Sequence, residues 1–553
     1  MSYILSRVCG YASLGIAVSL LSASQAEAAD VIAGPGDAGL RAAIAAAQED
    51  DRVILQSHVE LQAPLEINKR LTLRSSTGDP HTISIRAFFD GELFHIREDG
   101  ITFEGIGLTG SEQTDGFRVE ANVVLRDCYI QQFRWPVIFD FWSETTVRLE
   151  RCHVIFNEYG FEAPVLEAKD SIFSNNGKGF GGIGVSGRTV FLDGCRIEGN
   201  YGMGLGVAYG TVKNCTFRYN AGFGLWCDAD PGELSVSSSL FYANTEGGLV
   251  VGEQVVATVD NCTFTRHAGS PAVYVSSDVT SASFRHCTIT DNAFFESEHF
   301  PRQRIGSGAF TIERPDSVTL QNCLVADNPT SGSPHGASIS GSWIDGGGNV
   351  IGGPANVNVL ANNGGPTLTM LPLPGSPAID AGIPSDLTVD ARGLSRLAGS
   401  APDAGAIETA ATPPADADGD GLPDLWETFH GLNKNDASDA TSDADGDGQN
   451  ALAEFLSHTD PDDPQSVLRF VEARLAPRPA LPPDPRTTYF LWNHAPGLMY
   501  EVETSTDLQQ WHKVAGTFFP AGTLDGRPAM SFETQAQSGM SFYRVRVKPD
   551  PFE

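Results

Sequence analysis

Apolar and polar positions alternate in short runs along much of residues 53–326, and one run recurs with little change. In residues 123–130 its order is a β-branched residue, any residue, an apolar residue, two polar residues, a cysteine, any residue and an apolar residue. Alternation with a period of two predicts β-strands, and its recurrence predicts a repeat architecture. The cysteine position is filled in turn by Ile106, Cys128, Cys152, Ser171, Cys195, Cys215, Ser239, Cys262, Cys287 and Cys323, at spacings of 19–25 residues as far as Cys287.

Two further features repeat with the same period. An asparagine stands five residues after the cysteine position in most repeats, and a short alternating run of the form Gly-Leu-x-Val follows it. Each repeat is therefore predicted to hold three short strands joined by tight turns. The asparagines are Asn157, Asn176, Asn200, Asn220, Asn244, Asn292 and Asn328, and the alternating runs are residues 182–185, 204–207, 224–227, 248–251 and 272–275. Between Cys128 and Cys323, only Phe133 and His267 take the place of the asparagine.

A unit of about 22 residues with three strands cannot bury its inner face alone, so such units must stack into a solenoid. The repeat resembles the right-handed parallel β-helix of the pectate-lyase-like superfamily over residues 30–375, which implies an all-β fold. Inward cysteines suit such a stack because the thiol behaves as a small apolar group. The stacked asparagines are expected to adopt the left-handed backbone of a turn and to hydrogen-bond along the stack.

The first part of the mature chain is an Ala-rich segment, residues 37–48, with the pattern of a helix that begins at Asp37. It is similar to the amino-terminal cap of these β-helices, whose role is to cover the apolar end coil.

The cysteines allow two interpretations. Seven of them share the inward position of the repeat, which favours a stack of buried thiols, whereas Cys227 lies outside that register and is expected to point inward from the neighbouring strand. Neighbours in the stack, such as Cys195 and Cys215, are also close enough for a disulfide in an exported chain.

Export is predicted from residues 1–29, in which Arg7, an apolar run and small residues follow one another as in a signal peptide. No other segment is long and apolar enough to cross a membrane. The mature protein is thus expected to be secreted or at the cell surface, with no transmembrane segment, and to be a monomer. Its formal net charge of -33 argues against nucleic acid as a partner, because nucleic acids favour basic surfaces.

Residues 364–410 are similar to the choice-of-anchor Q domain, a module that follows β-helices in bacterial surface proteins. The resemblance rests on residues 364–367, 375–382, 390–393 and 403–408, although Ala391 stands where glutamine is common in that family. It implies a surface or exported protein and no particular chemistry, and the segment is expected to close the solenoid.

The acidic segment 411–466 carries the sharpest chemical signal. Two stretches, 416–427 and 443–454, match the twelve-position calcium loop, with Asp at positions 1, 3 and 5, Gly at position 6 and Glu at position 12. Calcium, the predicted cofactor, prefers oxygen ligands of this kind. No long helices flank the loops, so they resemble thrombospondin type 3 or dockerin-like repeats and are expected to be structural. The predicted ligands are Asp416, Asp418, Asp420, Leu422, Asp424 and Glu427, and Asp443, Asp445, Asp447, Gln449 and Glu454.

Residues 467–553 alternate apolar and polar positions between turns and are predicted to form a small β-domain, with a sandwich expected. Its role is a spacer, with surface attachment or carbohydrate binding as the alternative.

The resemblance to the pectate-lyase-like superfamily implies a polysaccharide groove along one outward sheet, where enzymes of this type use carboxylates, calcium and a basic residue. If the Gly-Leu-x-Val strands form that sheet, its outward positions carry carboxylates interleaved with aromatic rings, which suit sugars. The catalytic candidates are Asp140, Glu162, Asp228 and Arg118, and the substrate-binding candidates are Glu120, Trp142, Trp226 and Tyr274.

Two functional hypotheses follow. The first is an exported, calcium-stabilised β-helix surface protein that binds polysaccharide or a cell-surface glycan without turnover. The second is a polysaccharide lyase or glycoside hydrolase that acts on an acidic glycan in the same groove. No lyase signature and no adjacent pair of aspartates occurs on the predicted strands, so catalytic residues cannot be assigned from the family.

Overall fold

The computed structural model describes most of the chain. The described residues are 28–140, 143–178, 182–229, 231–267, 269–292, 308–328, 336–409, 416–422, 424–457, 459, 461–462 and 468, and, in the carboxy-terminal domain, 470–475, 487–493, 499–505, 512–514, 517–524, 527–535 and 542–548. The predicted signal peptide lies outside them, apart from its last two residues.

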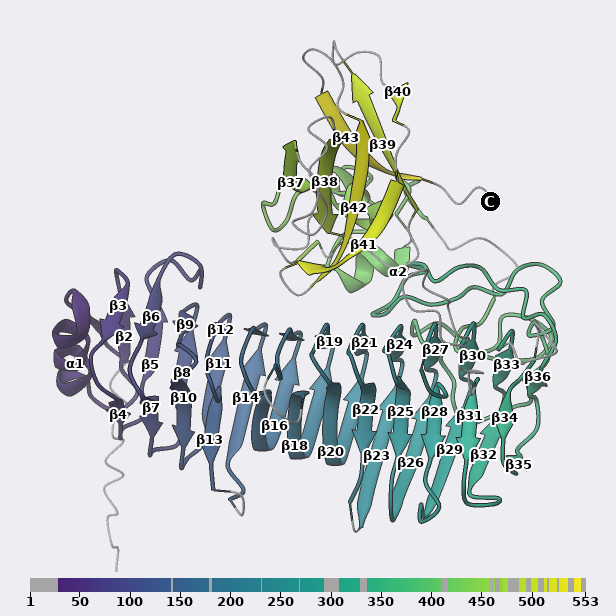
Figure 1. Ribbon diagram of the computed structural model, residues 1–553, viewed down its shortest axis with the longest axis horizontal. Coiled ribbons are helices and arrows are strands. Elements are labelled where there is room, and N and C mark those ends of the chain that lie inside the picture. Colours follow the sequence, from purple (N-terminus) through teal and green to yellow (C-terminus); the bar gives the residue numbers. More distant parts are fainter. Residues whose placement is uncertain are drawn as a thin grey trace, which may run out of the picture.

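Residues 30–351 form a parallel β-helix in which a coil contributes three strands, as the three-part repeat predicts (Figure 1). Face 1 holds the strands that end just before the cysteine position, face 2 those that begin just after it, and face 3 those of the Gly-Leu-x-Val series. The pairings between the described strands are parallel on all three faces.

The strand bounds follow the repeat closely. Face 1 consists of β1 (Asp30–Ile32), β2 (Arg52–Leu55), β5 (Thr72–Ser75), β8 (Ile101–Glu104), β11 (Val123–Arg126), β14 (Thr146–Glu150), β23 (Gly232–Ser237), β26 (Val255–Asp260), β29 (Ser281–Arg285), β32 (Val318–Gln321) and β35 (Ile344–Asp345). Three long strands continue from face 3 into face 1 and join the two into one sheet, namely β16 (Phe161–Lys169), β18 (Ile183–Asp193) and β20 (Met203–Lys213).

Face 2 is a separate sheet of 13 strands. Its strands are β3 (Val59–Leu61), β6 (Ser84–Ala87), β9 (Gly107–Thr109), β12 (Tyr129–Gln131), β15 (His153–Ile155), β17 (Ile172–Ser174), β19 (Arg196–Glu198), β21 (Thr216–Arg218), β24 (Leu240–Tyr242), β27 (Thr263–Thr265), β30 (Thr288–Thr290), β33 (Leu324–Ala326) and β36 (Val350–Ile351). Face 3 begins with β4 (Leu65–Ile67), β7 (Gly91–Ile96), β10 (Thr114–Val119) and β13 (Val137–Phe139), and continues after β20 with β22 (Phe223–Cys227), β25 (Gly247–Val251), β28 (Val273–Val275), β31 (Phe310–Ile312) and β34 (Ile339–Ser340).

The interior contains the two predicted stacks. All eight cysteines of the described chain are free and buried, including Cys227, which points inward from face 3. The asparagine amides form a buried ladder: Asn157 Nδ2 donates to Asn176 Oδ1 at 2.9 Å, and Asn200 Nδ2 donates to Asn220 Oδ1 at 2.8 Å. Because these amides bond from coil to coil, the polar turns need no water to be satisfied.

The expectation of left-handed backbone at the asparagines is wrong by one residue. The positive φ angles fall on the preceding position, for example 53° at Asn175, 56° at Tyr219 and 50° at Ala243. The preceding residue makes the corner, which leaves the ladder asparagine free to point its amide inward toward the next coil.

The amino-terminal helix is α1 (Gly36–Ala46), which buries Leu40, Ala43 and Ile44. It begins one residue before the predicted start, and Pro35 rather than Asp37 takes the N-cap position. Asp37 lies in the first turn, where its carboxylate accepts a hydrogen bond from Arg41 Nε at 2.6 Å.

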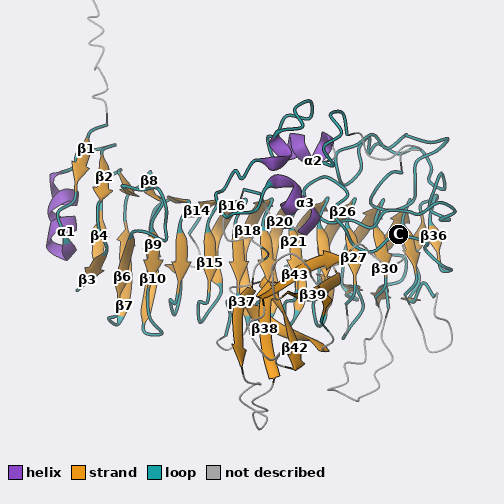
Figure 2. Ribbon diagram, turned by 90° about the horizontal axis from the view of Figure 1, so that it is seen from above, coloured by secondary structure: helices purple, strands orange, loops and turns teal. Residues whose placement is uncertain are grey.

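Residues 353–409 form a lateral layer that runs back along face 2 and also contacts the last coils. Thr367 Oγ1 donates to Ser238 O at 3.3 Å, and Asn261 Nδ2 donates to Val389 O at 3.0 Å. Figures 1 and 2 show these loops over the carboxy-terminal coils, near β27 to β36. Strands of the β-helix therefore end at β36, before the end of the predicted solenoid at residue 375.

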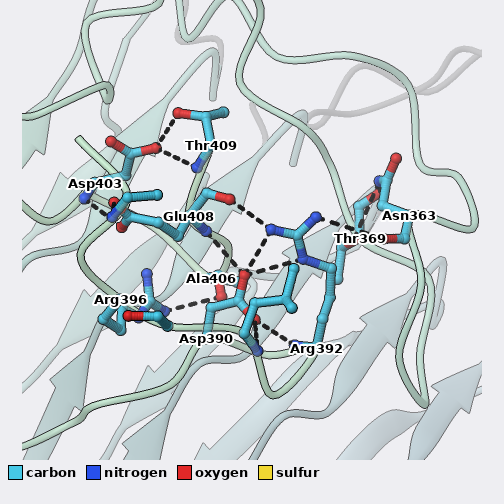
Figure 3. A network of polar contacts seen from close by, with 12 residues as sticks. Asn363, Thr369, Asp390, Arg392, Arg396, Asp403, Ala406, Glu408 and Thr409 are labelled. Carbon is cyan, nitrogen blue, oxygen red and sulfur yellow. Dashed lines mark hydrogen bonds and ion pairs between the residues drawn. The ribbon is translucent and has the colours of Figure 1, made fainter. Parts of the chain in front are cut away.

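A buried polar network holds the lateral layer together (Figure 3). Asp390 Oδ2 accepts hydrogen bonds from Arg392 Nη2 at 2.7 Å and from Glu408 N at 3.0 Å. Arg396 donates to the carbonyl oxygens of Gly405 and Ala406 at 2.8 and 2.9 Å, and it also donates to Asn261 of the β-helix. Arg396 thus ties the layer to face 2.

The described part of the acidic segment has three short helices, α2 (Asp424–Phe429), the 3₁₀ helix η1 (Asp439–Thr441) and α3 (Ala451–Ser457). The carboxy-terminal domain contains two antiparallel sheets. Their strand orders are β37–β38–β42–β41 and β40–β39–β43, with β37 (Phe470–Leu475), β38 (Thr487–Asn493), β39 (Met499–Ser505), β40 (His512–Lys513), β41 (Thr517–Leu524), β42 (Arg527–Gln535) and β43 (Phe542–Lys548). The antiparallel strands agree with the predicted β-domain, whereas the sandwich stays a prediction. Among the described residues, no helix combines the length and apolar character that crossing a membrane requires.

Candidate functional site

The repeat places several predicted site residues in one outward row on face 3. Strand pairing aligns Glu162 of β16 with Ser186 of β18, and it continues across β20, β22, β25 and β28. The row reads Glu162, Ser186, Gly206, Trp226, Val250 and Tyr274. Its five strand spacings span about 24 Å along the solenoid.

The carboxy-terminal half of this row is apolar. Trp226 and Tyr274 are half-buried and stand on either side of Val250, which is only 1% exposed although it faces outward in register. Phe223 packs edge-on against the indole of Trp226, with ring centroids 5.9 Å apart. Burial and a hydrogen bond to the Glu313 carboxylate raise the pKa of Tyr274 to about 12, so its hydroxyl remains protonated at neutral pH.

The amino-terminal half of the row ends in a carboxyl group. Glu162 is half-buried, and burial raises the pKa of its carboxyl above the ordinary value. Between Glu162 and Trp226 the row carries only Ser186 and Gly206. A Cβ atom added to Gly206 would lie no closer than 3.8 Å to its neighbours, so this position would accept a side chain without a clash.

Arg118, the basic residue predicted for the groove, forms an ion pair with Glu92. Arg118 Nε lies 3.6 Å from Glu92 Oε1, and on the same face Glu120 Oε1 lies 2.8 Å from His95 Nε2. Arg97 completes the set, with contacts to Glu66 at 3.1 Å and to Glu120 at 3.8 Å. These ion pairs link coils of the solenoid, and they lie toward its amino-terminal end, away from Trp226.

The other groove candidates are separated from one another. Asp228 is exposed just after β22, where its Oδ1 accepts a hydrogen bond from Glu253 N at 3.0 Å, and the strand that carries it lies three spacings, about 14 Å, from that of Glu162. Asp140 is exposed directly after β13, and the predicted binding residue Trp142 lies outside the described residues. The structure therefore brings Glu162, Trp226 and Tyr274 into one row, but it does not gather Arg118, Glu162 and Asp228 around one point.

The first acidic loop folds its carboxylates together. Ligand atoms of Asp416, Asp418 and Asp420 lie within 4.8 Å of one another, and the position-6 glycine, Gly421, adopts a φ of 95° that permits the sharp turn. Asp416 accepts backbone hydrogen bonds that shape the loop, including one from Gly421 N at 3.1 Å. Asp424 is not part of this cluster, and its Oδ1 accepts a hydrogen bond from Ala417 N at 2.7 Å.

The second loop repeats this arrangement. Asp443, Asp445 and Asp447 form a cluster within the same 4.8 Å limit, and Gly448 has a φ of 94°. Glu454, on α3, is fully buried. The side chain of Gln449 donates a hydrogen bond to Thr459 Oγ1 at 3.1 Å. The group that Gln449 can offer to a cation is therefore its backbone carbonyl oxygen.

The donor set fits a hard cation. Both clusters consist of carboxylate oxygens, which are the ligands that calcium prefers. Burial and the neighbouring charges of Asp418, Asp420 and Asp439 raise the pKa of Glu427 to about 7. A cation would offset that repulsion and keep the carboxylates ionised.

Two residues of these sites were missed at the sequence level. Asp439 joins Asp420 and Glu427 in a third cluster, although it lies outside both twelve-residue loops. Gly206 occupies the open position of the outward row. The glycine was visible in the Gly-Leu-x-Val repeat, whereas the place of Asp439 depends on how residues 428–438 return toward the first loop.

Comparison with known proteins agrees with the fold. A protein-family model described as the right handed beta helix region matches residues 94–264 and 230–365, so the solenoid is a right-handed parallel β-helix. A crystal structure of the pectate lyase Pel9A is similar at 14% sequence identity, covering 66% of this chain and 90% of that one with a TM-score of 0.34. Nothing about the function of this chain follows from a likeness at that level. The search of curated proteins gave no match.

Proposed function

We propose that this chain is an exported, monomeric β-helix protein that binds polysaccharide along the outward row of face 3 without turnover, and that two calcium loops stabilise it. The observation that carries the proposal is the row itself, in which Glu162, Trp226 and Tyr274 share one register with small residues between them. A polymer that lies along the solenoid axis can contact Glu162, Trp226 and Tyr274 at once, whereas Val250 is buried and does not take part.

The chemistry of the row suits a sugar chain. The rings of Trp226 and Tyr274 offer apolar faces on which pyranose rings can stack, and each also carries a polar group. The Glu162 carboxyl and the Ser186 hydroxyl can bond to sugar hydroxyls. Gly206 leaves space beside Trp226 for a sugar ring to approach the indole.

The alternative is a polysaccharide lyase or glycoside hydrolase that acts on an acidic glycan in the same groove. Burial raises the pKa of the Glu162 carboxyl, and a raised pKa is the direction in which a carboxyl is tuned for general acid catalysis, which favours this alternative. Binding is favoured over turnover because Arg118 is paired with Glu92 and because Glu162 and Asp228 are carried by strands about 14 Å apart.

The calcium loops, by this proposal, are structural and resemble thrombospondin type 3 or dockerin-like repeats. Residues 416–463 hold twelve Asp and two Glu against one Lys, so without cations the segment repels itself. With residues 364–410 similar to choice-of-anchor Q and residues 1–29 similar to a signal peptide, the chain is proposed to act at the cell surface or outside the cell.

The first test uses a glycan-binding panel that includes polygalacturonate and alginate. Trp226→Ala is expected to weaken binding about tenfold or more, because it removes a stacking face. Phe191→Ala is the matched control, since Phe191 is an outward aromatic residue, 46% exposed, on the face 1 part of β18. Equal affinities of both variants and the parent chain would contradict the assigned row.

Turnover is tested on the same glycans by the absorbance of unsaturated products and by a reducing-sugar assay. The proposal predicts binding with no product. Product formation that is lost in Glu162→Gln would replace it with the enzyme alternative.

A further inference from the structure

A third carboxylate cluster links segments of the acidic region that are distant in sequence. Asp420 comes from the first loop, Glu427 from α2 and Asp439 from η1, and their ligand atoms lie within 4.8 Å of one another. Asp439 follows Asp420 by 19 residues and lies outside both loop motifs.

Several carboxylate oxygens in and beside this cluster are buried and have no hydrogen-bond partner among the described residues. Glu427 is 0% exposed, and neither of its carboxylate oxygens has a partner; the same holds for both oxygens of Asp418 and for Asp439 Oδ1. The described ion pairs of the region place Lys434 on Asp424 instead, at 3.4 Å. Buried carboxylates without partners are destabilising, so this arrangement favours the binding of a cation.

The same residues connect the two loops. Asp439 Oδ2 accepts a hydrogen bond from Asn433 N at 2.7 Å, which fixes the turn before η1. Just after η1, Ser442 O accepts from Ala451 N at 2.9 Å, at the start of the helix that carries Glu454. One small core, made of Leu422, Trp426, Ala440 and Ala451, underlies both loops.

We propose that Asp439 supplies a further ligand to the first calcium site, and that this ligand couples the two loops into one cooperative calcium-binding unit. This rests on the proposed binding of calcium by the loops. A cation held by Asp420, Glu427 and Asp439 fixes η1, and η1 in turn positions α3 and its Glu454. Binding at the first site thereby orders the second, and the coupling is reciprocal.

The test is a calcium titration of the chelator-treated full chain by calorimetry, with magnesium as a second cation. The parent chain is expected to bind two calcium ions with positive cooperativity and to melt at a higher temperature with calcium than without it. Asp439→Asn, which keeps the shape of the side chain, is expected to weaken both sites by about tenfold or more.

Asp436→Asn is the control. It removes the same charge from the same segment, but Asp436 is exposed and outside the cluster, and asparagine keeps the oxygen that accepts from Ser438. If the parent chain binds no calcium, the proposed role of the loops fails. If it binds two ions and Asp439→Asn behaves like Asp436→Asn, the loops bind calcium and only the coupling through Asp439 fails.

Discussion

At the scale of single residues, the solenoid depends on identical side chains meeting their counterparts in the next coil. Asn220 Nδ2 donates to Asn244 Oδ1 at 2.8 Å, but the next position in the ladder is His267. His267 Nδ1 accepts a hydrogen bond from the backbone N–H of Asn244 at 3.2 Å, while Nε2 is buried without a partner among the described residues. Burial lowers the pKa of His267 to about 4. The ladder is therefore interrupted by a group that resists protonation in the folded state.

Because of His267, the free energy of unfolding is predicted to decrease as the pH decreases. Between pH 6.5 and 4 the unfolded chain binds a proton that folded His267 does not, so unfolding becomes more favourable as pH decreases. From pH 7 to pH 5 the free energy of unfolding of the parent chain should drop by about 2 kcal/mol more than that of His267→Asn.

Urea denaturation of the two proteins at both pH values measures this difference. Because all other titrating groups are common to both, parallel pH profiles would show that His267 contributes nothing.

At the scale of elements, the lateral layer is attached to the β-helix by apolar clusters and by polar contacts, of which those of Arg396 are buried. Arg396 is 3% exposed, and burial lowers the pKa of its guanidinium to about 10. It bonds to two carbonyl groups of the layer and to Asn261 of the β-helix. A buried charge of this kind stabilises only while its partners stay in place.

Arg396→Ala is predicted to destabilise the layer by about 3 kcal/mol, because it leaves buried acceptors and acidic side chains without their cation. Backbone amides of residues 390–409 should then exchange with solvent faster, while those of the β-helix strands stay protected.

Arg148→Ala serves as the control, since Arg148 forms an exposed ion pair with Glu167 that is worth less than about 1 kcal/mol. Unchanged exchange in residues 390–409 of Arg396→Ala would contradict the role given to Arg396.

Elements whose position follows from local spacing were predictable from the sequence. The three strands per coil, the inward cysteines and the alignment of Glu162 with Trp226 all follow from a period that fixes the register of neighbouring coils. The positive φ at Asn175, one residue before the ladder position, was not predictable, because it depends on where the inward amide of the next residue must point. The path of the lateral layer and the place of Asp439 depend on long-range contacts that no short motif encodes.

At the scale of the whole molecule, the proposed function depends on the regular spacing of the coils. Each coil presents one outward position to the row on face 3, so the contact area available to a linear polymer increases with the number of coils it crosses. The row from Glu162 to Tyr274 covers about 24 Å and includes both aromatic residues. The proposed binding mode therefore ties affinity to the length of the ligand.

The most direct measurement is the affinity of the full chain for a size series of oligosaccharides from the glycan that binds best in the panel. The account predicts that affinity rises with length until the ligand spans the row, at about 24 Å, and then levels off, and that Gly206→Leu abolishes the rise by filling the open position. Absence of binding across a broad panel, or an affinity that depends neither on length nor on Gly206, would contradict the assignment of the row as the polysaccharide site.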